Sequence, residues 1–302
     1  WNGNESVEVF NLSKETLKII KEGAPTEPPV REGGGSNGTE KKLRKYQEDA
    51  IDVWKGKDYR GILEHATGSG KTYTALNCIK MTYEEENPVV IIGVPYRLLG
   101  FQWAEECRNF FNEQDLQYEV VPCWSDFNNW RSDIRRAFNN RAIAKMEETK
   151  ILTIFIVVID TLRDSFDDHV FVNDEFDPED TFFIADECHN FGSLLMKKNL
   201  PEFRCRLGLS ATPIIDKENI RENEEYMEKF FGGIIDEYTL SDALNDPAGP
   251  YLAEYEYHPI SCDLSEDDYD DWLEDYKRSG WDDPDEENDT KKQQIFRRMN
   301  LV

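Results

Sequence analysis

The stretch 61-GILEHATGSGKTYTA-75 limits what this chain can fold into more than any other segment. A short apolar strand is followed by a turn that contains Gly68 and Gly70, and a helix is expected to begin at Lys71. The glycines allow the backbone to curl until several N–H groups face one point, and the helix start adds its own free N–H groups and the positive end of its dipole. The segment therefore predicts a strand–loop–helix unit whose loop binds a polyphosphate.

The loop matches a known phosphate-binding pattern with one departure. The strict form G-x-x-x-x-G-K-[ST] would place glycine at position 65, where this chain has His65. The second half of the pattern is complete. Lys71 would reach the β- and γ-phosphates of a bound nucleotide, and the Thr72 hydroxyl would ligate Mg²⁺.

Helical and strand patterns alternate over residues 41–240. Apolar runs predict strands at 61–64, 88–95, 118–122, 151–159, 181–185 and 206–209, and helical spacing predicts helices at 43–54, 71–83, 96–111 and 125–148. This alternation predicts a three-layer α/β domain with a mostly parallel sheet. Ligands of such sheets bind at the carboxyl ends of the strands, so motifs that follow different strands are expected to meet at one edge.

Two carboxylates follow the apolar strand 181–185. Asp186 would hold Mg²⁺ beside Thr72, and Glu187 would orient the water that attacks the γ-phosphate or accept its proton. Phosphoryl transfer needs charge neutralisation and an in-line nucleophile more than covalent help from the protein, and these groups supply both.

Further polar residues follow the carboxylates and the next strand. His189 would be either a neutral hydrogen-bond relay or a turn residue. Ser210 and Thr212 offer hydroxyl groups at the end of strand 206–209 but by themselves indicate no function.

Four ordered motifs resemble one superfamily. They are Y-Q at 46–47, ATGSGKT at 66–72, DECH at 186–189 and GLSATP at 208–213. In this order they resemble the first RecA-like motor domain of superfamily-two helicases and translocases, in a DECH variant of the DEAD/DEAH box. The segment 89–103 ends in L-x-x-Q-W, which is most similar to restriction-enzyme motor subunits and related double-stranded DNA translocases.

The resemblance implies a role for each matching residue. Gln47 would read the adenine edge of ATP, since an amide offers a donor and an acceptor, with Arg44 or Tyr46 near the base. The phosphates would be cradled by Thr67, Gly68, Ser69, Gly70, Lys71 and Thr72. Nucleotide state would be coupled to movement by His189, Ser210 and Thr212. The backbone of a nucleic acid would be contacted by Pro95, Tyr96, Arg97, Thr161 and Leu162.

The implied activity is ATP hydrolysis with Mg²⁺ that moves the protein on nucleic acid. The L-x-x-Q-W ending favours double-stranded DNA as the track, with RNA as the alternative. A nucleotide-gated switch or scaffold that does not translocate is a second hypothesis, and the intact Glu187 argues against it. A small-molecule kinase with the same loop would have no use for the Y-Q and SAT motifs. Restriction, anti-phage defence and repair all use such motors, and a nuclease or modification subunit is the partner to expect there.

The domain organisation follows from composition. Residues 1–40 predict an N-terminal segment that ends in a flexible Gly/Pro-rich linker, and residues 241–302 predict a connector and an acidic helical segment. Segment 250–260 resembles the connector towards a second RecA-like motor domain, which we do not expect within residues 1–302. That domain would supply the arginines that stabilise the transition state, so we expect poor hydrolysis without it.

The charge and cysteine content restrict the partners further. With 62 acidic and 35 basic residues the net charge is −27, which repels nucleic acid, so any groove for it must be basic locally or use backbone and hydroxyl donors. The six cysteines show no C-x-x-C pair, which argues against a zinc site or disulfides and favours the cytoplasm. The longest apolar run is too short to cross a membrane.

Overall fold

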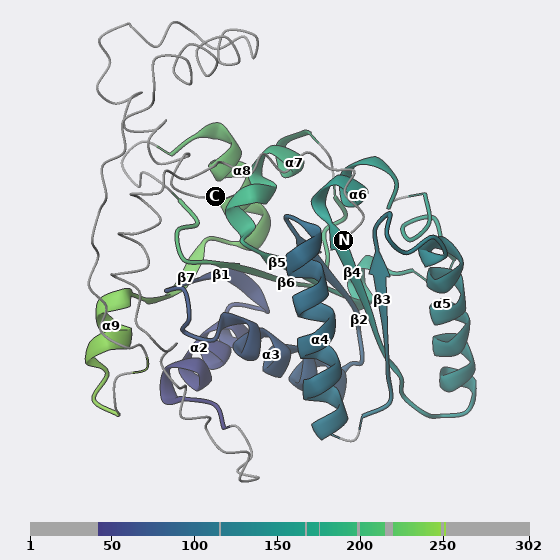
Figure 1. The fold of residues 1–302 in the computed structure, drawn as a ribbon, viewed down its shortest axis with the longest axis horizontal. Helices are drawn as coiled ribbons and strands as arrows, with labels where there is room; N and C mark the ends of the chain where they lie inside the picture. The colour runs from purple at the N-terminus through teal and green to yellow at the C-terminus, as the bar shows by residue number, and fades with distance from the viewer. Residues whose placement is uncertain are drawn as a thin grey trace, which may run out of the picture. The chain divides into compact units, whose positions relative to one another are not determined.

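The chain forms a seven-stranded sheet in which every strand pairing is parallel. The computed structural model of the 302-residue chain describes residues 42–114, 116–166, 168–174, 176–197, 200–214, 220–248 and 251. The strands are β1 (Arg60–His65), β2 (Val89–Val94), β3 (Tyr118–Cys123), β4 (Leu152–Val158), β5 (Thr181–Asp186), β6 (Cys205–Ser210) and β7 (Ile234–Tyr238). Their order in the sheet is β3-β4-β2-β5-β6-β1-β7 (Figure 1).

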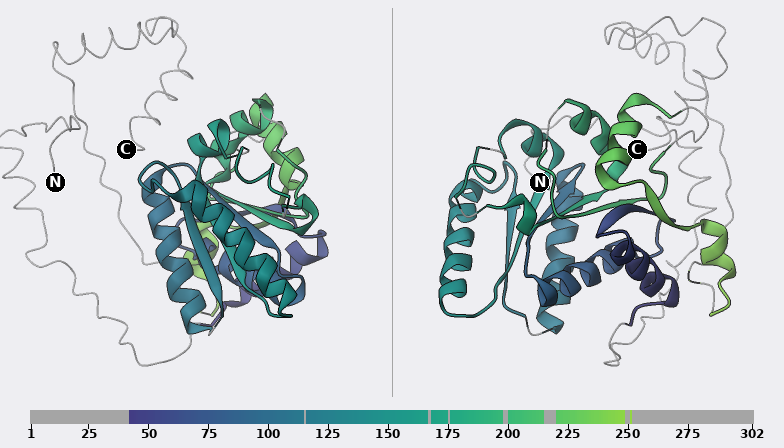
Figure 2. Two further views of the ribbon diagram at one scale, coloured as in Figure 1. Left: turned by 90° about the vertical axis from the view of Figure 1, so that its right-hand side faces the viewer. Right: turned by 180° about the vertical axis from the view of Figure 1, so that it is seen from behind.

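Helices connect the strands and cover both faces of the sheet (Figures 1 and 2). They are α2 (Lys45–Gly56), α3 (Lys71–Glu85), α4 (Arg97–Glu113), α5 (Trp130–Met146), α6 (Ile159–Asp164), α7 (Gly192–Lys197), α8 (Glu222–Phe231) and α9 (Leu240–Asn245), with short 3₁₀ turns η1 (Pro178–Asp180) and η2 (Cys188–Phe191). The predicted three-layer α/β class with a parallel sheet is confirmed. The predictions for residues 1–40, 250, 252–260 and the acidic stretch beyond lie outside the described residues.

The central strands are buried on both faces, which is why their sequences are continuous apolar runs. In β2, Val90 and Ile92 belong to the core beneath α2, α3 and α4. Val89 and Ile91 point the other way, into the core shared with α5, α6, α7 and α8. The same alternation holds in β4 and β5, so two hydrophobic layers enclose the sheet.

Strand β7 is an element that the sequence patterns do not predict. It follows Gly232 and Gly233, whose φ angles of 95° and 86° turn the chain back from α8. It then pairs with β1, and Gly61 permits the close approach because a Cβ there would lie 2.3 Å from Cδ1 of Ile235. As a result, β7 delivers Tyr238 to the same edge of the sheet as the loop after β1.

The predicted motifs other than Y-Q, which lies in α2, follow parallel strands of the sheet. The phosphate-binding loop follows β1, Glu187 follows β5, and the SAT turn begins at the end of β6, the strand that lies between them. Pro95 and the helix α6 follow β2 and β4, which lie on the other side of β5. Two neighbouring sites therefore share the carboxyl edge of the sheet. Among the helices of the described residues, none is long and apolar enough to span a membrane.

Gly192, the first residue of α7, lies where α7 contacts α8 and gives a test of this packing. A Cβ at Gly192 would lie 2.3 Å from the backbone oxygen of Asn223, so Gly192→Ala must push α7 from α8. We expect a loss of about 1–3 kcal/mol in the free energy of unfolding, measured by chemical denaturation. The control is Gly56→Ala, where a Cβ would meet nothing within 4 Å and stability should be unchanged or higher. Equal stability of the two variants would contradict the packing described here.

Candidate active site

The loop after β1 has the conformation that its glycines predict. Gly68 and Gly70 have φ angles of 80° and 92°, a region that other residues rarely adopt. Gly70 is the N-cap of α3, which begins at Lys71 as expected. Ser69 is 1% exposed, and its Oγ has no hydrogen-bond partner among the described residues. Thr67 is exposed at the rim of the loop.

His65 occupies the position where the strict pattern has glycine, and its side chain turns away from the loop. It is fully buried, and its Nε2 lies 2.7 Å from Oδ2 of Asp236 in β7. The His65 ring also meets Tyr46 and Tyr238 edge-on, with ring centroids about 6 Å apart. His65, which stands in place of the glycine, therefore links β1 to β7, and its side chain does not occupy the loop.

Lys71 lies beneath the loop. Its Nζ donates to the carbonyl oxygens of His65 at 2.9 Å and Ala66 at 3.4 Å. Burial lowers the pKa of Lys71, while the negative charges of Glu187 and Asp186 act in the opposite direction. The lysine is thus close enough to both carboxylates for their charges to act on it, which joins the loop and the DECH motif in one site.

Asp186 is a buried carboxylate at the end of β5, with 6% of its surface exposed. Its Oδ2 accepts a 2.7 Å hydrogen bond from the indole Nε1 of Trp103 in α4, and its Oδ1 accepts from the backbone N–H of Glu187 at 3.0 Å. Burial raises the pKa of Asp186, while the Trp103 hydrogen bond lowers it. The contact joins residues 83 positions apart, and only the L-x-x-Q-W resemblance marked Trp103 beforehand.

Glu187 has a left-handed backbone conformation, with φ 48° and ψ 54°. Such angles are uncommon for residues other than glycine and cost of order 1 kcal/mol or more, so the surrounding packing must enforce them. The side chain is half-buried, and its Oε2 lies 3.5 Å from Nδ1 of His189. The turn thereby directs Glu187 to the same edge of the sheet as Lys71.

His189 and the SAT turn are in contact, as the relay hypothesis requires. Nδ1 of His189 lies 3.0 Å from Oγ of Ser210, which also accepts from the backbone N–H of Thr212 at 3.1 Å. Burial, with a contribution from the Arg221 charge, lowers the pKa of His189 and so favours the neutral imidazole. A chain of hydrogen bonds therefore runs from the DECH turn to the end of β6.

The side chains expected near the adenine make hydrogen bonds and stacking contacts within the protein. Gln47 is 3% exposed; its Oε1 accepts from the backbone N–H of Arg44 at 3.0 Å, and its Nε2 donates to the carbonyl of Gly70 at 3.2 Å. Tyr46 donates its hydroxyl to the carbonyl of Ser69 and stacks on Tyr238, with ring centroids 3.7 Å apart. These contacts fasten the start of α2 to the phosphate-binding loop, and adenine recognition by Gln47 stays a prediction.

Arg44 lies at the N-cap of α2, next to Tyr46 and Gln47. Its guanidinium carbon is 3.9 Å from the ring centroid of Tyr251, a cation–π contact. The ring of Tyr251 is 5.8 Å from that of Tyr46, so Arg44 belongs to the same aromatic group.

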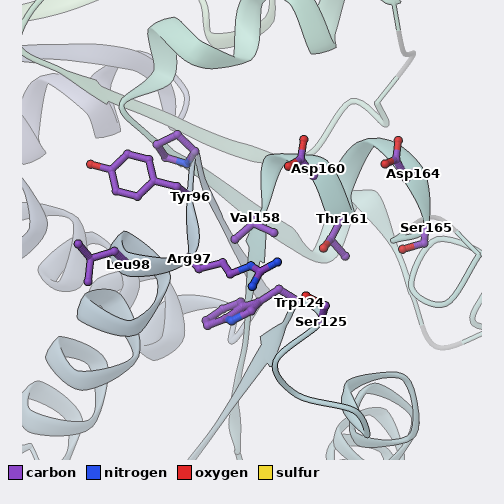
Figure 3. A pocket seen from close by; sticks show the side chains of 11 residues that line it. Tyr96, Arg97, Leu98, Trp124, Ser125, Val158, Asp160, Thr161, Asp164 and Ser165 are labelled. Atoms are coloured by element: carbon purple, nitrogen blue, oxygen red, sulfur yellow. The ribbon is translucent and has the colours of Figure 1, made fainter. Parts of the chain in front are cut away.

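A groove of about 590 Å³ lies at the ends of β2 and β4, on the side of β5 away from β6 and β1 (Figure 3). Its lining residues are Pro95, Tyr96, Arg97, Leu98, Trp124, Ser125, Val158, Asp160, Thr161, Asp164 and Ser165. Four of the five predicted nucleic-acid contacts are thus brought together. In Figure 3 the Arg97 side chain extends between Trp124 and Thr161, while the carboxylates of Asp160 and Asp164 point away from it.

Leu162 is the exception among these contacts. It is fully buried in the core beneath α6, so its side chain is not available to a nucleic-acid backbone, contrary to the expectation. The reason is that the strand ends at Val158 and a helical turn begins at Ile159, which rotates Thr161 towards the groove and Leu162 into the core.

The donor groups of the site fit a magnesium ion shared with a nucleotide. Mg²⁺ prefers oxygen ligands and is usually held by one or two carboxylates together with substrate phosphates. Asp186 offers a buried carboxylate, and the half-buried Thr72 offers a hydroxyl at the start of α3. Within the described residues no cluster of three or more His, Cys, Asp and Glu side chains could hold a metal by itself.

Comparisons with known proteins agree with this geometry. The type I restriction enzyme SsaAORF53P endonuclease subunit of Staphylococcus saprophyticus subsp. saprophyticus is 22% identical over 213 residues, which is 68% of this chain and 21% of that subunit. The SauMSSORF170P endonuclease subunit of Staphylococcus aureus is 22% identical over 191 residues, or 62% of this chain and 18% of that subunit. The chain spans about a fifth of the length of these curated relatives.

A solved structure shares the fold. The nuclease-deletion mutant of the type ISP restriction-modification enzyme LlaGI, in complex with a DNA substrate mimic, aligns with a TM-score of 0.51 and 20% identity. The alignment covers 68% of this chain and 20% of that one. Residues 40–215, more than half of the chain, match the family described as "Type III restriction enzyme, res subunit". The chain therefore belongs to this family, and its fold and motifs are those of a first motor domain of a superfamily-two helicase or translocase near the restriction-enzyme motor subunits.

Proposed function

We propose that this chain is the first motor domain of a translocase that hydrolyses ATP with Mg²⁺ and moves on double-stranded DNA. One observation carries the proposal. Lys71 at the start of α3 and the carboxylates of Asp186 and Glu187 at the end of β5 lie at the carboxyl edge of the sheet, and a groove lies at the ends of the neighbouring strands β2 and β4. A nucleotide site alone would account for the first feature. The two together fit an enzyme that uses nucleotide hydrolysis at a nucleic-acid surface.

The residues divide the chemistry of hydrolysis among them. The N–H groups of the loop and of the start of α3 would bind the phosphates. The Lys71 ammonium would move away from the carbonyls of His65 and Ala66 and neutralise the charge of the phosphates. Asp186 and Thr72 would hold Mg²⁺, which supplies further charge neutralisation when bound. Glu187 would orient the attacking water or accept its proton, as a general base does.

The groove would bind the sugar–phosphate backbone and would not read bases. Arg97 supplies a guanidinium, and Thr161, Ser125 and Ser165 supply hydroxyl groups, which are donors suited to phosphate oxygens. Contacts of this kind position a duplex without regard to its sequence. Hydroxyl groups can bind phosphate oxygens without a positive charge, so a groove lined by them can work in a protein whose net charge is negative.

We propose that a second RecA-like domain, in the protein to which this segment corresponds, completes the site with its arginines. A nuclease or modification subunit would act with the motor, as the restriction enzymes among its relatives suggest. Residues 1–40 would form an N-terminal segment and a flexible linker, and residues 241–302 would lead towards the second domain. Without that domain we propose that ATP turnover is slow.

ATP hydrolysis by the intact protein tests the proposal. We would measure turnover without polynucleotide and then with double-stranded DNA, single-stranded DNA and RNA. Stimulation by double-stranded DNA is the expected result, and stimulation by another polymer would reassign the track. Turnover that no polymer alters would favour a nucleotide-gated switch that does not translocate.

Arg97 gives a second test of the groove. The guanidinium is exposed, and its Nη1 donates to Oδ1 of Asp126 at 2.9 Å. Arg97→Ala removes a phosphate donor and leaves the Asp126 carboxylate uncompensated, so we expect DNA affinity to fall by about 1 kcal/mol, roughly five-fold. Arg108→Ala is the control, because Arg108 is exposed near the opposite end of α4. If both variants bind DNA like the wild type, the groove is not the binding surface.

A further inference from the structure

Trp103 connects the groove to the carboxylate pair through a single helix. Its indole Nε1 donates to Oδ2 of Asp186 at 2.7 Å, and Trp103 itself is 1% exposed. Arg97, six residues earlier on α4, lines the groove. At 1.5 Å of rise per residue, about 9 Å of helix separates the two positions.

The first turns of α4 are packed tightly against the wall of the groove. A Cβ at Gly100 would lie 2.9 Å from Cη2 of Trp124, which lines the groove, and Phe101 meets the same indole edge-on with ring centroids 5.2 Å apart. The same face of α4 continues into the core, to which Trp124 also belongs, with Ala104, Cys107, Phe110 and Phe111. Because packed elements of this kind shift as units, a change in the groove wall is passed along the helix.

At the other end of this path, the Asp186 carboxylate has little freedom. One oxygen accepts from Trp103 and the other from the backbone of Glu187, so the indole and the strained turn together fix its plane. A displacement of α4 must therefore alter the orientation of Asp186 or break a buried hydrogen bond to a charged group. Small misplacements of such groups have large effects at reacting centres.

The polar contact distinguishes Trp103 from other buried tryptophans. Trp54 donates its indole N–H to the backbone oxygen of Arg206 at 3.0 Å, far along the sheet from Asp186. The indole N–H of Trp124 has no partner among the residues that the structure describes. Of these three, Trp103 is the one that donates to a side chain of the nucleotide site, which packing alone does not require.

We propose that Trp103 is a positioning residue that couples occupancy of the groove to the orientation of Asp186, so that duplex DNA and the magnesium–nucleotide complex strengthen each other's binding. This inference rests on the proposed function, since it assumes that the groove takes DNA and the loop takes ATP. It adds the physical path by which one site senses the other. The coupling must be reciprocal, because it is a free energy shared by two binding equilibria.

The test measures binding in the intact protein. The affinity for a non-hydrolysable ATP analogue with Mg²⁺ is determined with and without duplex DNA, and the ratio of the two is the coupling factor, typically about 5–150. In Trp103→Phe an aromatic ring stays in the core and the indole donor is lost, so the factor should fall towards one while DNA affinity alone is kept. Trp54→Phe, which loses an indole hydrogen bond elsewhere, should keep the wild-type factor.

A rescue variant separates the hydrogen bond from the bulk of the ring. The imidazole of histidine superposes on the five-membered ring of an indole, so Nε2 in Trp103→His would lie where Nε1 lies now. Partial return of the coupling in this variant is expected. Wild-type coupling in Trp103→Phe, or equal loss in the phenylalanine and histidine variants, would overturn the inference.

The proposed function can fail separately. If the wild-type protein binds the analogue and DNA but neither alters the affinity for the other, the coupling is overturned and the two binding sites stand. If the wild-type protein binds neither, the proposed function itself is wrong, and the inference falls with it.

Discussion

Lys71→Ala is expected to reduce ATP turnover by about 10²–10³-fold or more, to the background of the assay. Lys71 is the cation that the structure holds beneath the phosphate-binding loop, near Asp186 and Glu187. Removing it leaves the developing negative charge on the phosphates without its nearest protein counter-charge. Steady-state hydrolysis with saturating Mg²⁺ and DNA measures the effect.

The stability of the same variant tells lost chemistry from lost folding. A variant that folds like the wild type keeps its melting temperature, so thermal unfolding of Lys71→Ala is measured beside the wild type. Lys80→Ala is the matched control on α3; its Nζ bonds to Oε1 of Gln114, away from the loop, and turnover should be unchanged. Normal ATP turnover by Lys71→Ala would contradict the assignment of this loop as the nucleotide site.

Glu187→Gln should keep nucleotide binding and lose hydrolysis, with turnover lower by about 10²–10⁴-fold. The amide has the shape of the carboxylate and can stay in the same turn, but it cannot accept a proton or orient water as an anion does. The exchange should not alter the left-handed backbone at position 187, because glutamate and glutamine have the same shape and the same steric limits on φ and ψ. Binding of a fluorescent ADP and single-turnover hydrolysis separate the two effects.

The control for this variant is Glu113→Gln. Glu113 is an exposed carboxylate in the last turn of α4, the end of that helix away from the groove, so neutralising it should change neither binding nor turnover. A Glu187→Gln protein that hydrolyses ATP normally would remove the residue from the mechanism and favour the switch hypothesis.

The parts of the fold that local sequence determines were predictable. The loop after β1 carries its conformation in two glycines, and α3 begins at Lys71 because Gly70 can take the left-handed angles that its N-cap position has here. β2 and β4 are recognisable as apolar runs because a parallel sheet buries both of their faces. The meeting of the motifs followed from strand direction alone.

Contacts between distant elements were not predictable in the same way. β7 has only two apolar residues at its start, and its place beside β1 depends on the glycine turn after α8 and on the space at Gly61. The stack of Tyr46 on Tyr238 and the Trp103–Asp186 hydrogen bond both depend on how helices and strands pack. A tryptophan on an amphipathic helix looks like core, and no periodicity reveals where its N–H points.

Side-chain direction at element ends was a further source of error. Thr161 and Leu162 are adjacent in sequence, and the prediction treated them alike. The first faces the groove and the second is buried, because α6 begins sooner than the strand pattern suggested. The residue type of Gln47 indicated an amide that needs hydrogen-bond partners. It did not reveal that the carbonyl of Gly70 in the loop is one of those partners.

The paired arginines of the groove region have a consequence for how a polyanion binds in salt. Arg97 already holds Asp126, and Arg163 in α6 holds Asp160 and Asp164. A guanidinium that turns to a phosphate leaves its carboxylate behind, and that carboxylate takes up a cation from solution. This uptake offsets the cations that the polyanion releases. Binding is then an ion exchange, and the logarithm of its constant should fall with the logarithm of salt less steeply than about 0.9 per neutralised phosphate.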